Sequence, residues 1–147
     1  MQPKWTSERY LLTFRCSGLE LAVDLAAVER VVRAESGLPE DLAAEASLLD
    51  ERHIPRVHLP SDFGSVDEAS SAIVLKIGED AAWLPVDEVH GGRVVPENQV
   101  QTPSDERRFA EDVYVSGLVR QHGSSVIVLD AEILIYVARR SQGAHLG

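Results

Sequence analysis

One pattern of residues recurs in two fifteen-residue stretches of this chain, and the recurrence constrains the fold more than any other feature of the sequence. Residues 19–33 are LELAVDLAAVERVVR and residues 81–95 are AAWLPVDEVHGGRVV. Each stretch runs from a short apolar segment to a Val-Asp step, which ends at Asp24 or Asp87, and has a Val-Val pair that begins seven residues after that aspartate. The surroundings of the two stretches match as well. We therefore expect two related halves that fold into one body.

The residues around Asp24 predict a strand, a tight turn, a second strand and a short helix. Tyr10–Cys16 alternates in side-chain character, which is the period of a half-buried strand. Ser17-Gly18 supplies a turn, and Leu19–Val23 returns as the second strand of a hairpin. Asp24 is a good helix cap, and the segment Leu25–Val28 that follows it is long enough for one helical turn.

The rest of the chain is organised around further short strands. We expect a short acidic helix, or a loop with one helical turn, over Ser36–Glu51, and a polar linker over residues 60–71. Pro55 indicates that a strand at His53–Leu59 lies at a sheet edge or begins there. The remaining predicted elements are strands at Glu29–Arg33, Ala72–Ile77, Ala81–Val86, Val89–Val95, Val113–Arg120 and Ser124–Asp130, a closing helix over Ala131–Arg139 that Asp130 caps, and a disordered tail.

Length and strand content together predict the architecture. A chain of 147 residues is one domain by the usual sizes. About ten short strands, few helices and two similar halves indicate a mostly β protein of two small barrels. We expect the first barrel to use residues 10–60 with contributions from the C-terminus, and the second to use residues 72–130, with residues 60–71 as the linker between them.

Charge and composition exclude several classes of function. The 24 acidic side chains outnumber the 14 basic ones and give a net charge of −10, whereas binding to nucleic acids or anionic lipids needs an excess of Lys and Arg. Apolar runs such as Ile133–Ala138 are too short to span a bilayer, so we expect no nucleic-acid partner and no membrane insertion. Cys16 is the only cysteine, which leaves no intramolecular disulfide. The N-terminal MQPKWTSERY lacks the apolar run of a signal peptide, and a cytoplasmic protein is expected.

Several segments share a pattern of apolar positions with a few fixed polar ones. They are YLLTFRCSGLELAVDLAAVERVV and IPRVHL in the first half, and WLPVDEV, VSGLVR and VIVLDAEIL in the second. Together they resemble the CheW-like domain family, the adaptor module of bacterial chemosensory arrays, over Tyr10–Leu134. The resemblance implies a mostly all-β fold of two five-stranded SH3-like β-barrels packed side by side, with a short helix after the first hairpin and a C-terminal helix.

The chain departs from this family at positions that are usually fixed. Where the family has a Glu after the short helix this chain has Arg30, and where it has an Arg-Gly step, counting back from Pro55 gives Asp50-Glu51. In the family the Glu and the Arg form an ion pair near the partner-binding surface. One hypothesis is that Arg30 and Asp50 still meet with reversed charges and present an inverted pattern to a matched partner. The other is that the loop has drifted and leaves them unpaired. Further departures are His58, Pro60 and Trp83, the last in place of a small residue.

Catalytic chemistry finds little support in the residues. Asp24 and Asp87 are equivalent in the repeat, so we expect them at the ends of two separate barrels, too far apart for acid–base work and engaged in capping and turns. His53 and His58 are five residues apart on a predicted strand and face opposite sides, so they do not bind one metal. No glycine-rich phosphate loop and no Gly-x-Ser-x-Gly motif is present. We therefore expect no enzyme, no metal and no cofactor.

The resemblance implies a non-catalytic adaptor that joins the cytoplasmic tips of chemoreceptors, the methyl-accepting chemotaxis proteins, to the regulatory domain of a CheA-type histidine kinase. The residues carried over as the receptor-side site are Val28, Arg30 and Asp50. A second hypothesis is a divergent member that has lost one interface and binds only receptor or only kinase. A third, from another class, is a small-ligand-binding or hydrolytic β-barrel, which an enclosed polar pocket would favour and filled barrel interiors would oppose.

Overall fold

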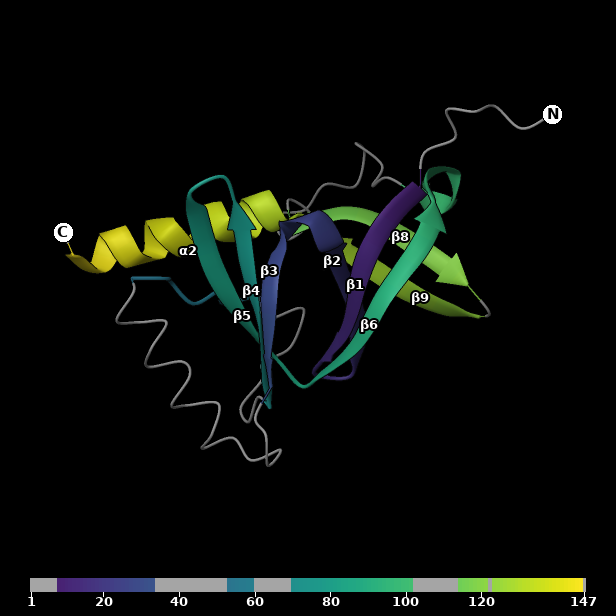
Figure 1. Ribbon diagram of the computed structural model, residues 1–147, viewed down its shortest axis with the longest axis horizontal. Coiled ribbons are helices and arrows are strands. Elements are labelled where there is room, and N and C mark those ends of the chain that lie inside the picture. The colour runs from purple at the N-terminus through teal and green to yellow at the C-terminus, as the bar shows by residue number, and fades with distance from the viewer. Residues whose placement is uncertain (1–7, 34–52, 60–69, 102–113, 122, 147) are drawn as a thin grey trace.

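The computed structural model describes residues 8–33, 53–59, 70–101, 114–121 and 123–146. In chain order its elements are β1 (Glu8–Cys16), β2 (Leu19–Asp24), the 3₁₀ helix η1 (Leu25–Ala27), β3 (Val28–Arg33), β4 (Ser71–Ile77), β5 (Asp80–Val86), β6 (Glu88–Pro96), the 3₁₀ helix η3 (Glu97–Gln99), β7 (Val100–Gln101), β8 (Val115–Gln121), β9 (Ser124–Leu129) and α2 (Ala131–Leu146) (Figure 1). The prediction of a mostly β molecule with a short helix after the first hairpin and a C-terminal helix is confirmed. The predicted segment at Ser36–Glu51 and most of the predicted linker lie outside the described residues.

The strands form two sheets, and the two halves of the repeat exchange their third strands. The order is β6-β1-β2-β9-β8-β7 in the six-stranded sheet and β3-β4-β5 in the three-stranded sheet. The hairpin β1–β2 is followed by β3, which pairs with β4 of the other hairpin. The hairpin β4–β5 is followed by β6, which pairs with β1. Each half thus gives its last strand to the other half's sheet, and the strands of residues 72–130 are divided between both sheets.

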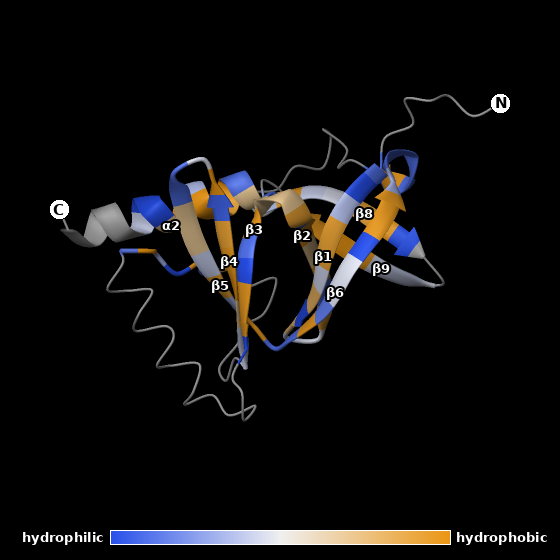
Figure 2. Ribbon diagram, viewed as in Figure 1, coloured by the Kyte–Doolittle hydropathy of each residue, from blue (hydrophilic) through white to orange (hydrophobic). Residues whose placement is uncertain are grey.

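The main core lies between the two sheets and α2. Phe14 and Leu21 from the six-stranded sheet, Leu75 and Leu84 from the three-stranded sheet, and Leu134 from α2 are all at most 1% exposed and pack into one cluster. β4 is a continuous apolar run because both of its faces are covered in the middle of its sheet. The helix contributes Leu134, Ile135 and Ala138 and packs on β4 and β5. In Figure 2 the orange of the hydrophobic residues is concentrated on the strands.

A second core fills the inside of the six-stranded sheet. Its buried members come from five strands of that one sheet: Leu11, Ala22, Val95, Val119, Val126 and Val128. Residues of β1 and β6 can meet residues of β8 and β9 only because the sheet curls back on itself, as Figure 1 shows for β8 and β9 crossing behind β1. β1 is therefore covered on both faces along its middle, with Leu11 in this core and Leu12 in the main one, so the prediction of a half-buried strand was wrong there.

Three local predictions differ from the structure, and two short elements were not predicted. Asp24 forms no capping hydrogen bond at η1, and its carboxylate accepts hydrogen bonds from Arg9. The strand predicted at His53–Leu59 is reduced to one parallel bridge between Arg56 and Trp83, flanked by two backbone hydrogen bonds to Trp83. η3 and β7 were not predicted. The closing helix begins as expected, where the Ile133 amide donates to the Asp130 carboxylate at 3.2 Å, but it continues to Leu146 through the predicted disordered tail.

Candidate partner-binding surface

β3 carries two of the three residues predicted to bind a partner, and a β-bulge separates them. Val28 pairs with Leu75 and Arg30 pairs with Val74, with a register shift between them at Glu29. Leu75 and Val74 are consecutive and therefore point to opposite faces of the sheet. The extra residue of the bulge thus turns Arg30 away from Val28. Without the bulge the two side chains would share one face.

Val28 faces the junction between the two sheets. Its side chain is half-buried and packs against the main core. Its backbone amide donates to the carbonyl of Leu25, which closes η1 and holds the two residues next to each other. Leu25 is 39% exposed. Val28 thus lies at the inner border of an exposed apolar area.

That area continues across β1 and β6. Tyr10 and Val94 are directly paired and are 55% and 51% exposed. Two residues further along the same ladder, and so on the same face, Gly92 pairs with Leu12. A Cβ placed on Gly92 would lie 4.0 Å from Leu25 Cδ2, so the leucine lies over the side-chain-free strand. Tyr10, Leu25 and Val94 form what we call the β1–β6 patch, with Val28 beside it.

Arg30 belongs to a different surface, on the outer face of the three-stranded sheet. One cross-strand row runs from Arg30 through Val74 and Trp83 to Arg56. The Trp83 ring is 5% exposed and packs with Val74, and the Arg56 guanidinium lies 5.5 Å from its centroid. Two residues at which the chain departs from the family pattern, Arg30 and Trp83, therefore share one row. Within the described residues the Arg30 side chain forms no ion pair, and its predicted partner Asp50 lies outside them.

The two aspartates of the repeat lie at opposite ends of the first hairpin. Asp24 pairs with Leu11 and forms an ion pair with Arg9 at 2.9 Å. Asp87 accepts a hydrogen bond of 2.7 Å from the backbone amide of Ser17, in the β1–β2 turn. Six residues of strand separate Leu11 from Ser17, which corresponds to about 20 Å. The carboxylates are therefore too far apart to act on one substrate bond. They lie at the two ends of one hairpin, however, and not at the ends of two separate barrels as the sequence predicted.

Other reactive groups in the described part of the chain have structural surroundings. Burial, and to a lesser extent the charge of Asp87, raises the pKa of the Cys16 thiol from 9.0 to about 11, so the thiol is neutral and unreactive at neutral pH. Among the described residues no group of three His, Cys, Asp or Glu side chains is placed to hold a metal ion, and Ser71 is the one buried polar residue. No described helix is long and apolar enough to cross a membrane.

A two-sheet molecule with filled cores, an exposed apolar patch and no catalytic cluster among its described residues has the character of a protein-binding module. The model of the CheW-like domain matches residues 10–139, and the chain belongs to this family of adaptor domains. Its fold is similar to the crystal structure of the scaffolding protein TtCheW from Thermoanaerobacter tengcongensis, with a TM-score of 0.59 and 19% identity over 84% of this chain and 89% of that one. No curated protein sequence matches it significantly.

Sequence reasoning missed the β1–β6 patch. Tyr10 and Val94 were placed in two separate predicted strands, and no pairing between these strands was predicted. The register between β1 and β6 decides that these two side chains meet, beyond the end of the main core. The Gly91-Gly92 pair was the available signal, because two consecutive glycines in a strand leave room for a side chain from another element.

Proposed function

We propose that the chain is a non-catalytic cytoplasmic adaptor that couples the signalling tips of chemoreceptors to the regulatory domain of a CheA-type histidine kinase. Membership of the CheW-like family supports the adaptor role. The single observation that carries the proposal is the β1–β6 patch: exposed apolar side chains from three elements lie together beside Val28. An exposed apolar patch of this kind is the surface on which an amphipathic helix of a partner docks.

The patch has the composition of an interface centre. Tyr10 offers an aromatic ring with two torsions to restrict, which makes it a favourable anchor, and its hydroxyl lies 3.5 Å from Glu8 at the polar rim. Leu25 and Val94 add apolar area on either side. Apolar burial would supply the affinity, and the charged side chains around the patch would set the register of the partner.

A second candidate, loss of one interface, rests on the row that contains Arg30. Where the family places a carboxylate, this face presents Arg30, and Arg56 stands at the other end of the same row. A partner matched to the usual negative charge would meet two cations. A partner surface selected for this chain would carry acidic residues there. The chain would then bind only receptor or only kinase of the ordinary type.

The hydrolytic or ligand-binding barrel is less well supported. The interior of the six-stranded sheet is filled by six buried apolar side chains. Such a barrel would need an enclosed space lined with polar groups at this place. We propose no catalytic role for Asp24 or Asp87.

The test measures receptor and kinase binding separately by calorimetry. Tyr10→Ser combined with Val94→Ser should weaken binding of a receptor-tip fragment at least about tenfold, because both exposed side chains are lost from the patch. Ile77→Thr removes a comparable exposed apolar group at a distant site and should leave receptor affinity unchanged. Undiminished receptor binding by the double variant would refute the patch as the docking site.

The kinase measurement separates the two candidates. If the wild-type chain binds both the receptor fragment and the kinase regulatory domain, the full coupler is supported. Binding to one of them alone supports the one-interface adaptor, and Arg30→Glu should then recover the missing interaction. Binding to neither would overturn both candidates. Restoration of kinase activation in receptor arrays that lack their adaptor tests the same role in an assembled system.

A further inference from the structure

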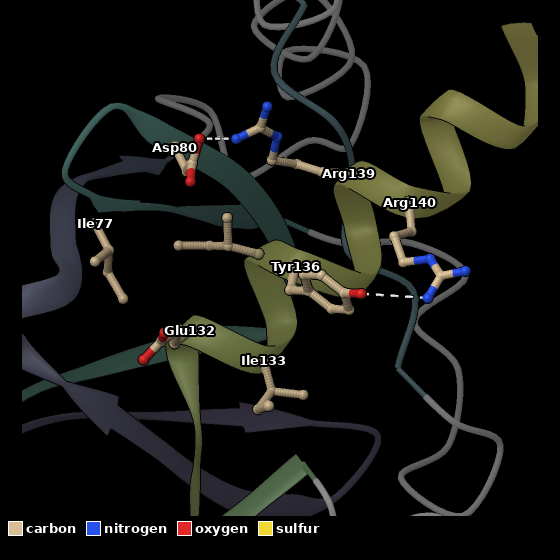
Figure 3. A pocket seen from close by; sticks show the side chains of 8 residues that line it. Ile77, Asp80, Glu132, Ile133, Tyr136, Arg139 and Arg140 are labelled. Atoms are coloured by element: carbon tan, nitrogen blue, oxygen red, sulfur yellow. Dashed lines mark hydrogen bonds and ion pairs between the residues drawn. The ribbon is translucent and has the colours of Figure 1, made fainter.

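A pocket of about 630 Å³ lies between α2 and the end of the hairpin β4–β5 (Figure 3). These elements lie on the other side of the molecule from β1 and β6 (Figure 1). Its apolar lining consists of Ile77 from β4 and of Ile133, Ile135 and Tyr136 from α2. Ile77 is 42% exposed and Tyr136 is 56% exposed. Arg139 forms an ion pair with Asp80, which fixes the hairpin end against the helix. The pocket is thus a formed feature with an exposed tyrosine at its edge.

The charges along this face of α2 are arranged symmetrically about Tyr136. The lining residues of the helix include Glu132, Ile133, Tyr136, Arg139 and Arg140, which is the spacing of a single helical stripe. Glu132 is four residues before Tyr136 and Arg140 is four residues after it. Within the described residues neither of these two charges is in an ion pair. Arg140 instead donates to the Tyr136 hydroxyl at 3.2 Å, with its guanidinium 5.8 Å from the ring centroid.

We propose that this face binds a second copy of the chain, with the two α2 helices antiparallel and Tyr136 at the two-fold axis. In such an arrangement Glu132 of each copy faces Arg140 of the other, so that the two-fold symmetry gives two such ion pairs in the dimer. The Tyr136 ring of each copy enters the pocket of the other, against Ile77 and Ile133. A surface that pairs with an identical copy of itself needs both positive and negative side chains. The stripe on α2 carries both, in Glu132 and Arg140. The inference does not depend on the proposed receptor and kinase partners.

The expected dimer is weak. The stripe from Glu132 to Arg140 is about 12 Å long, shorter than stable interfaces require. The net charge of −10 on each copy also opposes association. At physiological salt this long-range repulsion is screened beyond about 8 Å, whereas contacts across the stripe are shorter than that. Self-association should therefore increase as salt is raised from very low to physiological concentration, because the repulsion is screened first.

Sedimentation equilibrium of the full chain, from about 10 µM to about 1 mM, measures the dimer directly. Tyr136→Asp should abolish it, because a charge would be placed on the axis against its own copy. Tyr10→Ser, an exposed aromatic replacement outside the pocket, should leave the dissociation constant unchanged. A chain that stays monomeric over the whole range, or a dimer that survives Tyr136→Asp, would overturn the proposal.

Charge reversal tests the antiparallel pairing itself. Glu132→Arg and Arg140→Glu should each raise the dissociation constant about tenfold, because two attractive contacts become repulsive. An equimolar mixture of the two single variants should associate as well as the wild type, since both cross-pairs are again opposite in sign. Glu132 and Arg140 are both exposed, so circular dichroism should show both variants folded. Failure of the mixture to associate would contradict the arrangement.

Discussion

The two hairpins of the repeat end in opposite environments. Cys16 closes β1 and Ile77 closes β4, each paired with the first residue of the returning strand. Cys16 is 1% exposed and Ile77 is 42% exposed. The difference comes from the segment that covers each end. Asp87, which follows β5, accepts from the Ser17 amide and donates its own amide to the Arg15 carbonyl, so it covers the first hairpin.

In the described part of the chain, α2 lies beside the end of the second hairpin and leaves a pocket there. The ion pair of Arg139 with Asp80 ties the helix to the hairpin without covering Ile77. Equivalent sequence patterns therefore specify the hairpin and the crossover of its next strand, but not the burial of its end. Burial depends on what the rest of the chain brings, and an end left open is available to a partner.

The largest predicted effects on stability come from substitutions in the main core, to which we expect the two halves to contribute equally. Leu21 and Leu84 are 63 positions apart in the repeat, are 0% and 1% exposed, and pack in the same cluster. Leu21→Ala and Leu84→Ala should each lower the free energy of unfolding by about 2–5 kcal/mol through lost burial and a cavity. Urea denaturation followed by circular dichroism measures both. A large cost at one position and none at the other would show that the halves are not equivalent inside.

Cys16, at the covered end of the first hairpin, should make the free energy of unfolding depend on pH in the alkaline range. The pKa of Cys16 is about 11 in the folded chain, compared with 9.0 for the free thiol. Because the folded pKa is the higher one, the fold binds this proton more tightly. Its contribution to stability is complete below pH 9 and is lost as the pH rises to about 11. The loss should be about 2–3 kcal/mol at most.

Cys16→Ala is the control for this effect. Other groups titrate in the same range, so the measured quantity is the difference in the free energy of unfolding between the wild type and the variant from pH 8 to pH 11. The wild type should lose more stability than Cys16→Ala over this interval. Parallel curves would contradict the assignment of the thiol to a covered, neutral position.

Much of the fold could be predicted from local pattern, because the hairpins are set by alternation and by turn residues such as Ser17-Gly18. η3 and β7 could not, because Glu97–Gln99 is polar throughout and β7 is two residues long. β7 is positioned by packing between distant residues. A Cβ on Gly117 would lie 2.5 Å from Val100 Cγ1, so only glycine allows β8 to approach β7 this closely. No local pattern contains that requirement.

The candidate site was less predictable than the fold. The resemblance carried Val28 and Arg30 over together as partner-binding residues, but the bulge at Glu29 turns Arg30 to the other face of the sheet. A bulge depends on the register that the neighbouring strand imposes, which lies about 45 residues away along the chain. Tyr10 and Val94 were placed in predicted strands, but alternation indicates only which residues share a face, and not how far the opposing sheet extends over it.

The two aspartates offer a finer comparison of the halves. Asp87→Ala removes an acceptor from the Ser17 amide, a hydrogen bond to a charged group, and should cost about 1–2 kcal/mol of unfolding free energy. Asp24→Ala breaks an ion pair with Arg9 in which Asp24 is 49% exposed, and should cost about 0–1 kcal/mol. Thermal denaturation of both variants at the same pH shows which substitution lowers stability more. The reverse order would mean that the Arg9 pair, and not the covering aspartate, stabilises the first hairpin.

The smallest effect is expected at the open hairpin end. Ile77→Thr keeps a β-branched side chain in β4 and removes an apolar group that already contacts water, so the free energy of unfolding should change by less than about 0.5 kcal/mol. The matched change at the covered end, Cys16→Ser, places a hydroxyl in an apolar cluster and should cost about 1–3 kcal/mol. Chemical denaturation of dilute protein compares the two without a contribution from self-association. A cost at Ile77 equal to that at Cys16 would mean that the second hairpin end is covered in solution, and that the pocket beside α2 is not open to a partner.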